Sequence, residues 1–379
     1  MKPSVRFCLA VIAAALSLVI QAAEVPTPDP PALGARGYLL LDHDSGAILA
    51  ESNADERLEP ASLTKIMTDY VIFRELADGD LTLEEEVLVS EKAWRTGGSK
   101  MFIEVGNQVS VKDLLLGVIV QSGNDAAVAL AEHVAGSEDS FAGLMNTHAE
   151  RLGMTRSHFM NATGLPHPEH YTTPRDIARV TAATIREFPD YYRWYAEPEF
   201  TYNGIRQSNR NRLLSMDPSV DGVKTGHTEA AGYCLVASAV RDDQRLISVV
   251  MGTASESARA ADSMALLNYG FRFFETHVPY EAGQTLARLR VWAGDSTELP
   301  VGPATDVAVT IPRGKYPELS AELEPAGAID APVAQGDVVG QIVFKLGGQE
   351  VGREPAVALQ PIGRGGLVRR ATDSILRLF

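Results

Sequence analysis

The order of strand-like and helix-like segments constrains the fold of this chain more than any other feature of its sequence. Two apolar runs, Gly37–Asp42 and Ala47–Ala50, flank a turn and predict a pair of strands. Segments of helical periodicity follow, and the chain then returns to strands around the turn Arg241–Gln244 before a last helical segment, Arg259–Phe274. This order predicts an α+β domain over residues 37–280, in which helices flank an antiparallel sheet.

Capping signals mark the starts of helices between these strands. Ser110 and Asp113 form a capping-box pattern ahead of the apolar run Leu114–Val120. Thr173, followed by a proline, predicts a second helix start, and Ser137–Leu152 has helical periodicity of its own. Because these helices follow one another without an intervening strand, we expect them to form a helical subdomain beside the sheet.

The composition of the sequence changes at about residue 281. Short β-branched runs separated by Gly, Pro and Asp take over, as in Val307–Ile311 and Val338–Phe344. These runs predict a small all-β domain over residues 281–363.

The last segment, residues 364–379, is predicted to form an amphipathic helix. At about 100° per residue, apolar side chains gather on one half of this helix and arginines on the other. The apolar half comprises Leu367, Val368, Ala371, Ile375, Leu376, Leu378 and Phe379. A basic face opposite an apolar face favours a helix that lies on an anionic membrane. The alternative is a terminal helix docked on the protein's own core.

The first residues of the chain predict export. Lys2 and Arg6 precede the apolar run Phe7–Ile20, a pattern typical of a secretory signal peptide over residues 1–23. The run is shorter than the ~20 residues of a membrane-spanning helix, although an uncleaved anchor is the alternative. The proline-rich residues 24–36 follow as a predicted linker.

The charge of the chain excludes one class of partner. Its formal net charge is −15 at pH 7, and contacts with nucleic-acid phosphates need a basic face. We therefore expect no nucleic-acid partner.

Three short motifs carry candidate chemistry. Ser62-Leu-Thr-Lys65 stands at a predicted helix start, where positions three apart share a face and the lysine amine can reach the serine hydroxyl. Ser122-Gly-Asn124 lies at a junction between helices, where its side chains can relay a proton and hold a substrate carbonyl. Lys224-Thr-Gly-His-Thr228 lies on a predicted strand, where a lysine and hydroxyls can bind a carboxylate and Gly226 admits a substrate close to the backbone. Each motif alone is common, but their combination and order are typical of serine β-lactamases and penicillin-binding proteins.

The chain resembles the D-alanyl-D-alanine carboxypeptidase family of low-molecular-mass penicillin-binding proteins. This family combines a β-lactamase/transpeptidase-like domain with a carboxyl-terminal β domain and an amphipathic anchor. The resemblance covers nearly the whole chain and is carried by Glu59–Met67, Gln121–Ala126, Asn209–Asn211, Val220–Thr228, Gly232–Tyr233 and Gly270–Thr276.

The resemblance implies a role for each motif residue. Ser62 would be the acylated nucleophile, Lys65 its general base, and Ser122 and Asn124 the remainder of the proton network and substrate clamp. The substrate-binding residues would be Lys224, Thr225, Gly226, His227, Arg259 and Arg210, with Arg259 near the terminal carboxylate of D-alanine. The backbone N–H groups of Ser62 and His227 would form the oxyanion hole.

The resemblance also implies the reaction, the partners and the location. Ser62 would attack the bond between the two terminal D-alanines of a peptidoglycan stem peptide, and water would hydrolyse the acyl-enzyme. β-Lactams would acylate the same serine as inhibitors, and no metal or cofactor would be needed. The protein would lie in the periplasm, bound peripherally to the outer face of the bacterial inner membrane.

Three other enzyme activities share these motifs, and a non-catalytic protein that keeps the fold is a further alternative. A serine β-lactamase needs a deacylating glutamate with an asparagine four residues on, a pairing that Arg156–Pro174 does not contain. A D,D-endopeptidase or a transpeptidase differs only in substrate geometry or in the acceptor, so both stay open. A non-catalytic wall-binding scaffold would not need the intact Ser62, Lys65, Asn124 and Lys224.

Overall fold

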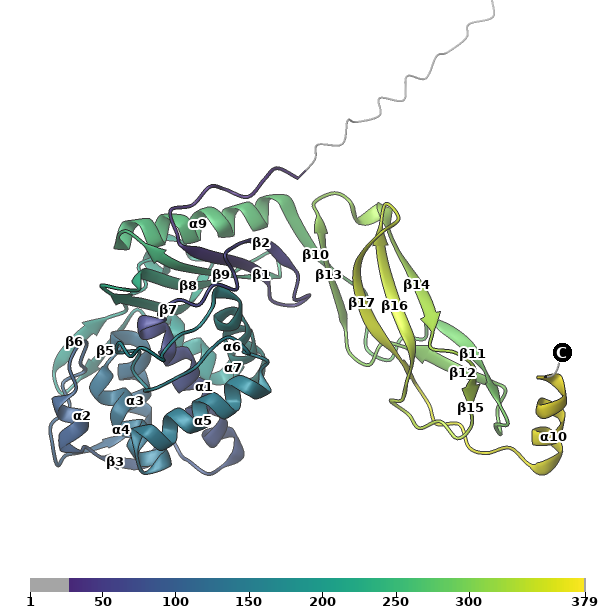
Figure 1. The fold of residues 1–379 in the computed structure, drawn as a ribbon, viewed down its shortest axis with the longest axis horizontal. Helices are drawn as coiled ribbons and strands as arrows, with labels where there is room; N and C mark the ends of the chain where they lie inside the picture. Colours follow the sequence, from purple (N-terminus) through teal and green to yellow (C-terminus); the bar gives the residue numbers. More distant parts are fainter. Residues whose placement is uncertain (1–26, 378–379) are drawn as a thin grey trace, which may run out of the picture.

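The computed structural model describes residues 27–377, which form a helix-rich part, a β-rich part and a terminal helix (Figure 1). The helix-rich part is built on an antiparallel sheet of five strands in the order β2-β1-β9-β8-β7. These strands are β1 (Gly37–Asp42), β2 (Ile48–Ser52), β7 (Val220–Thr228), β8 (Gly232–Arg241) and β9 (Gln244–Thr253). Because β1 pairs with both β2 and β9, the strands predicted on either side of the helical region belong to one sheet.

Helices cover both faces of this sheet. Neighbouring strand residues point to opposite faces, so Leu40 and Leu235 pack with α9 (Glu256–Phe273) while Leu39 and Val236 pack with the other helices. Figure 1 shows α9 on one side of the sheet and the group that contains α1 and α5 on the other. The remaining helices of this part are α1 (Thr64–Asp78), α2 (Glu91–Arg95), α3 (Val111–Leu116), α4 (Asn124–Ala135), α5 (Glu138–Arg151), α6 (Pro174–Glu187), α7 (Pro189–Tyr192) and α8 (Leu213–Met216).

Short elements complete the helix-rich part. Two antiparallel ribbons pair β3 (Glu86–Leu88) with β4 (Gln108–Ser110) and β5 (Glu199–Tyr202) with β6 (Ile205–Ser208). The short helical segments are η1 (Ala61–Leu63), η2 (Gly117–Gln121) and η3 (Arg193–Ala196).

The structure confirms the predicted helix starts. The Ser110 hydroxyl accepts a hydrogen bond from the backbone N–H of Asp113 at 3.1 Å, and α3 begins directly after this serine. The Thr173 hydroxyl likewise accepts from the N–H of Asp176 at 3.1 Å at the start of α6.

The segment predicted as a single helix, Leu114–Val120, differs from the prediction. α3 ends at Leu116, and the chain then widens into the π-helical segment η2. A Cβ on Gly117 would lie 2.3 Å from Sδ of Met101, so the glycine leaves room for this methionine against the widened turn. This packing partner is distant in the sequence and leaves no trace in helical periodicity.

The β-rich part contains a six-stranded sheet, a two-stranded ribbon and the short helical turn η4 (Tyr316–Glu318). The sheet has the order β14-β16-β17-β12-β11-β15, and the ribbon pairs β10 with β13. The strands are β10 (Phe274–Tyr280), β11 (Ala287–Trp292), β12 (Glu298–Gly302), β13 (Val307–Pro312), β14 (Leu319–Pro325), β15 (Ile329–Asp330), β16 (Val338–Leu346) and β17 (Gln349–Ala358). With the terminal helix α10 (Leu367–Leu376), this architecture confirms the predicted fold class.

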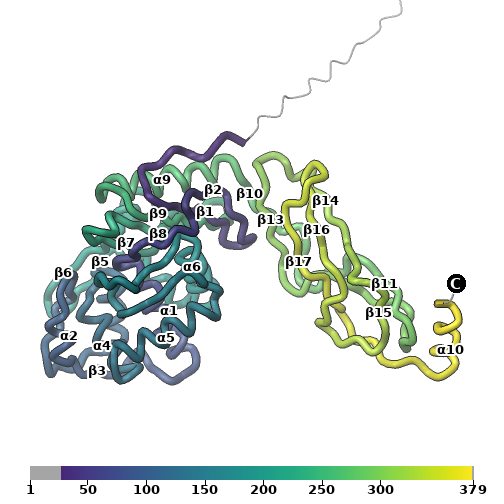
Figure 2. The backbone as a smooth tube through the Cα atoms, in the orientation of Figure 1, coloured from purple at the N-terminus to yellow at the C-terminus, as the bar shows by residue number. Residues whose placement is uncertain are grey.

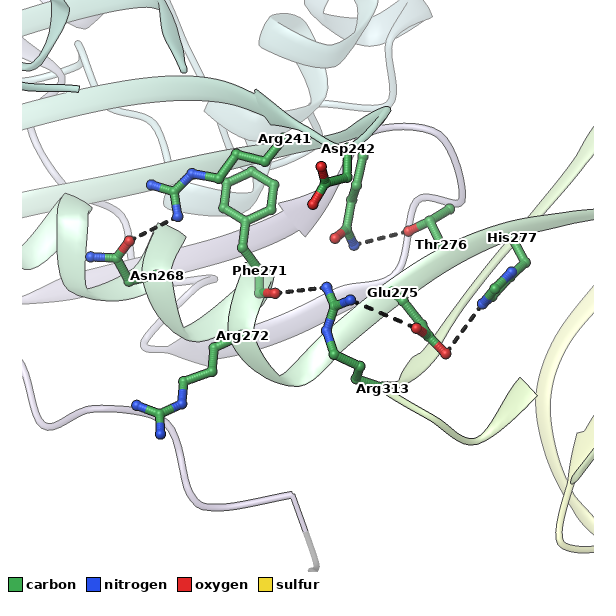
Figure 3. Close-up of a pocket in the computed structure, with 10 residues that line it drawn as sticks. Arg241, Asp242, Asn268, Phe271, Arg272, Glu275, Thr276, His277 and Arg313 are labelled. Carbon is green, nitrogen blue, oxygen red and sulfur yellow. Dashed lines mark hydrogen bonds and ion pairs between the residues drawn. The ribbon is translucent and has the colours of Figure 1, made fainter. Parts of the chain in front are cut away.

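The two parts meet where α9 passes into β10. The fully buried carboxylate of Asp42 accepts hydrogen bonds from Nε2 of Gln244 at 3.1 Å and from Oγ1 of Thr276 at 2.5 Å. Gln244 also donates to Thr276, beside a junction cavity of about 660 Å³ (Figure 3). Because β10 pairs with β13, the β-rich part begins before residue 281, the position at which the composition of the sequence changes.

The ends of the described chain lie on different parts of the molecule (Figure 2). Residues 27–36 run beside α9, where the Tyr269 hydroxyl donates to the carbonyl of Pro28 at 2.9 Å. The predicted signal peptide, residues 1–23, lies outside the described residues. No helix within residues 27–377 has both the length and the hydrophobicity to cross a bilayer.

Candidate active site

Ser62 lies in η1, the short turn that leads directly into α1. Three residues later, the Nζ atom of Lys65 lies 3.2 Å from the Ser62 Oγ. The same Nζ atom lies 2.6 Å from Oδ1 of Asn124 and 2.7 Å from the carbonyl oxygen of Thr163. Lys65 is fully buried, and three oxygen atoms fix its amine.

The surroundings of Lys65 favour its neutral form. Burial, reinforced by the charge of Lys224, lowers the pKa of Lys65 well below its usual range. A neutral amine has two N–H groups, and these can donate hydrogen bonds to the oxygens of Asn124 and Thr163. Its lone pair is then left for the Ser62 hydroxyl, the arrangement that a general base requires.

The second motif lies at the end of η2. Ser122 has a left-handed backbone with φ of 65°, and its buried hydroxyl has no hydrogen-bond partner within residues 27–377. Asn124 begins α4 and is held at both ends of its amide, because its Nδ2 donates to the carbonyl of Gly97 at 2.7 Å. The amide of Asn124 is therefore oriented, whereas the Ser122 hydroxyl is free to turn toward a bound molecule.

The third motif lies on β7, at the edge of the sheet. A Cβ on Gly226 would lie 3.2 Å from the backbone nitrogen of Ser62 and 3.0 Å from the carbonyl oxygen of Pro60. The glycine thus allows β7 to pass directly against the turn that carries the serine. On the same strand Thr225 is buried, whereas the His227 side chain is exposed.

Lys224 is the second buried lysine of the site. Its Nζ atom lies 3.3 Å from the carbonyl oxygen of Thr225, and burial lowers its pKa to about 7. A lysine that titrates near neutral pH is sensitive to the charges around it.

The two predicted arginines also reach these motifs. Nη1 of Arg259 donates to the carbonyl of Gly226 at 3.2 Å, and its guanidinium lies 5.6 Å from the ring centre of Tyr233. The Tyr233 ring in turn stacks on His227 at 4.0 Å. Nε of Arg210 donates to the carbonyl of Gln121 at 3.1 Å, next to the second motif. The structure therefore links both arginines to the motif backbones.

Sequence reasoning missed three contributors to this region. Thr163 contributes only a backbone carbonyl, which has no signature in the sequence. Asp69 lies four residues after Lys65, a helical spacing from which it could have been found. Tyr195 donates a hydrogen bond to Asp69 at 2.6 Å from η3, a contact between distant segments. Within the described residues, no group of three His, Cys, Asp or Glu side chains is placed to hold a metal ion.

Comparison with known proteins identifies the family. A sequence profile described as D-alanyl-D-alanine carboxypeptidase matches residues 24–255. The chain belongs to this family. A second profile, described as the C-terminal domain of penicillin-binding protein 5, matches residues 274–364 and begins at the first residue of β10.

Individual relatives extend this likeness over both parts of the chain. The D-alanyl-D-alanine carboxypeptidase DacC of Escherichia coli (strain K12) is 46% identical over 363 residues, 93% of this chain and 90% of the relative. The structure of penicillin-binding protein 5 from Haemophilus influenzae has a TM-score of 0.86 and 42% identity, and the match covers 89% of this chain and 100% of that one. Penicillin-binding protein D2 from Listeria monocytogenes, solved in the ampicillin-bound form, has a TM-score of 0.59 and 29% identity, with coverage of 63% and 98%.

Proposed function

We propose that this carboxypeptidase acts on peptidoglycan stem peptides through an acyl-enzyme on Ser62. The observation that carries the proposal is the Lys65 amine, which lies 3.2 Å from the Ser62 hydroxyl while carbonyl oxygens of Asn124 and Thr163 accept from it. Membership of the D-alanyl-D-alanine carboxypeptidase family supports the substrate class.

The first half of the reaction is acylation. Neutral Lys65 takes the hydroxyl proton of Ser62 as Oγ attacks the carbonyl carbon between the two terminal D-alanines. The N–H groups of Ser62 and His227 stabilise the oxyanion of the tetrahedral intermediate. As the C–N bond breaks, the proton passes to the departing amine, with the Ser122 hydroxyl as the relay, and free D-alanine leaves.

The second half is hydrolysis. A water molecule gives a proton to Lys65 and attacks the ester carbonyl, which restores the oxyanion. The C–O bond to Ser62 then breaks, Oγ recovers the proton, and the shortened stem leaves as a carboxylic acid. Both halves use the Lys65 amine, the two serine hydroxyls, the two backbone N–H groups and, in the second half, water.

Charge complementarity supports the orientation of the substrate. Lys224 and Arg259 lie on or beside β7, and both attract the terminal carboxylate of a D-Ala-D-Ala peptide. Thr225 and Gly226 offer the edge of the strand to the peptide backbone, His227 lines the site, and Arg210 adds positive charge from the other side. Asn124 holds the substrate amide.

The proposal extends to β-lactams as inhibitors. A β-lactam presents a strained amide and a carboxylate in the place of the D-Ala-D-Ala group, so Ser62 would open the ring and keep the product as an ester. The ampicillin-bound form of the Listeria monocytogenes relative supports this expectation.

The test is intact-mass spectrometry of the chain with penicillin, alongside D-alanine release from a peptide that ends in D-Ala-D-Ala. We expect a slowly lost penicilloyl adduct and D-alanine release from the wild type, and neither from Ser62→Ala. Ser320→Ala, which changes an exposed serine of β14, is the matched control and should behave as the wild type. Release of D-alanine by Ser62→Ala would overturn the proposed nucleophile, and a fast-clearing adduct without release would indicate a β-lactamase.

We also propose that residues 1–23 direct export to the periplasm and that α10 holds the protein on an anionic membrane surface. α10 contacts the β-rich part through its polar side, because the carboxylate of buried Asp373 accepts from the N–H of Ala293 at 2.7 Å. Its apolar side chains face outward, with Leu367 81% and Val368 83% exposed. The core of the protein therefore leaves the apolar side of α10 free for lipid.

Co-sedimentation with vesicles that contain phosphatidylglycerol tests the membrane proposal. Leu367→Asp with Val368→Asp should abolish binding, because both charges enter the face that would contact lipid. Val338→Asp, an exposed apolar position of β16, is the matched control and should leave binding unchanged. Equal binding by all variants would contradict the role of α10.

A further inference from the structure

Asp69 is a buried carboxylate that the proposed mechanism does not use. It lies on α1 four residues after Lys65 and has no exposed surface. The Tyr195 hydroxyl donates to its Oδ2 at 2.6 Å, while its Oδ1 has no hydrogen-bond partner within the described residues. An unpaired oxygen in a buried charged group is costly to keep, so it calls for a functional explanation.

The charges around Asp69 are mostly positive. Lys65 lies on the same face of α1, and the charge of Lys224, a buried lysine of β7, lowers the pKa of Asp69. Arg210 and Arg259 add further positive charge around Lys224, and Asp125 of α4 is the other carboxylate that acts on Lys65.

Asp125 is already committed to the backbone. Its carboxylate accepts from the N–H groups of Met101 and Phe102, both at 2.9 Å. Asp69 is therefore the carboxylate with an oxygen left over for the buried lysines.

We propose that Asp69 is a positioning residue that supplies the counter-charge of Lys224, so that Lys224 keeps its positive charge while Lys65 stays neutral. One carboxylate compensates one ammonium group, and a second ammonium in the same buried space would be repelled. Lys224 is therefore the protonated lysine, and its positive charge binds the substrate carboxylate. Lys65 is the neutral lysine, and it can accept the proton of Ser62. This inference rests on the roles proposed above for the two lysines.

The pKa shifts link Asp69 electrostatically to both lysines. Burial raises the pKa of Asp69 to about 7, against the opposing effects of Tyr195 and the two lysines, and the Asp69 charge raises the pKa of both lysines. Asp69 and Lys224 therefore titrate close to neutral pH, and the charge of each affects the protonation of Lys65.

The test is the pH profile of kcat/KM for D-alanine release by Asp69→Asn. Without the carboxylate, Lys224 loses its proton at a lower pH, so the alkaline limb should move to lower pH by about one unit or more. The acidic limb, which reports Lys65, should move in the same direction. At pH 8 most of the loss should appear as a higher KM, because Lys224 contacts the substrate in the ground state.

Two further variants make the test specific. Tyr195→Phe removes a hydrogen bond that favours the charged form of Asp69, so its profile should shift in the same direction by a smaller amount. Asp42→Asn changes another fully buried carboxylate, at the junction with β10, and should leave both limbs in place.

A lower rate for Asp69→Asn without movement of either limb, or an unchanged profile, would overturn the inference and assign Asp69 a purely structural role. If Asp69→Asn fails to fold, an unshifted Tyr195→Phe profile would overturn it equally. Loss of release in Ser62→Ala together with unshifted limbs would refute the role of Asp69 and leave the proposed function intact.

Discussion

The two parts of the molecule use charge in opposite ways. In the helix-rich part, both faces of the sheet are covered, and Lys65, Asp69 and Lys224 are almost completely buried. In the β-rich part, charged side chains pair on the surface, as Arg353 does with Glu324 and Glu350. Burial displaces the pKa values of the first set from their usual range, whereas solvent screens the second set. Chemistry at neutral pH therefore needs the more complete enclosure of the first part.

The sharpest test of this comparison is to remove one lysine from each part. Lys65→Ala should lower kcat/KM for D-alanine release by about a thousandfold, because the serine loses its base. Lys345→Ala removes a lysine that pairs with Glu322 on the surface of the β-rich part and should leave the rate unchanged. The test is the rate of D-alanine release by both variants, measured at the same pH. Substantial release by Lys65→Ala would contradict the role of this amine as the base.

A pair of strand glycines tests the role of close packing. Gly226→Ala places a Cβ 3.0 Å from the carbonyl oxygen of Pro60 and should displace β7 from Ser62, with a loss of about tenfold to a hundredfold in acylation by penicillin. Gly352→Ala in β17 meets its nearest atom at 4.0 Å and should have no effect on acylation. Equal acylation rates in the two variants would show that β7 tolerates the extra methyl group.

The pH dependence of stability gives a smaller effect. The pKa of Lys224 is about 7 in the folded chain and close to its usual value of about 10.4 in the unfolded chain. Above pH 7 the unfolded chain therefore holds the extra proton, and the free energy of unfolding should rise with pH until about pH 10. Lys224→Met should flatten this rise by an amount on the order of a few kcal/mol, measured by urea unfolding at several pH values.

The smallest effect is expected at the surface of the β-rich part. Arg353→Ala removes the partner of Glu324 and Glu350, all three of them solvent-exposed. We expect a melting temperature close to that of the wild type, with unchanged D-alanine release. A large drop in melting temperature would show that charge pairing matters as much in this part as in the other.

Local patterns predicted much of this molecule. The spacing of Ser62 and Lys65 on one helical face, and the capping residues Ser110 and Thr173, depend on neighbours within a few residues. The same is true of the apolar and β-branched runs that predicted the strands. Such features follow from helical spacing, from capping hydrogen bonds and from local composition.

Contacts between segments that are distant in the sequence could not be predicted from local patterns. Gly117, at the start of the π-helical turn, packs closely against Met101, and the partner of Asp69 comes from η3. In α10, Asp373 lies on the polar half of the helix, and its carboxylate is buried against the N–H of Ala293, so the polar half contacts the rest of the protein. Periodicity gives the two sides of a helix but not the side that the rest of the protein will contact.

The direct connection between α9 and β10 also affects the distance between the active-site serine and α10. α9 ends at Phe273 and β10 begins at Phe274, so no loop separates them, and Thr276 is hydrogen-bonded to Asp42 just beyond this point. The β-rich part therefore lies between the helix-rich part and α10, which is at its far end (Figure 1). A protein held by α10 would carry its serine at a set height above the surface, and would reach only those strands of the wall that pass at that height.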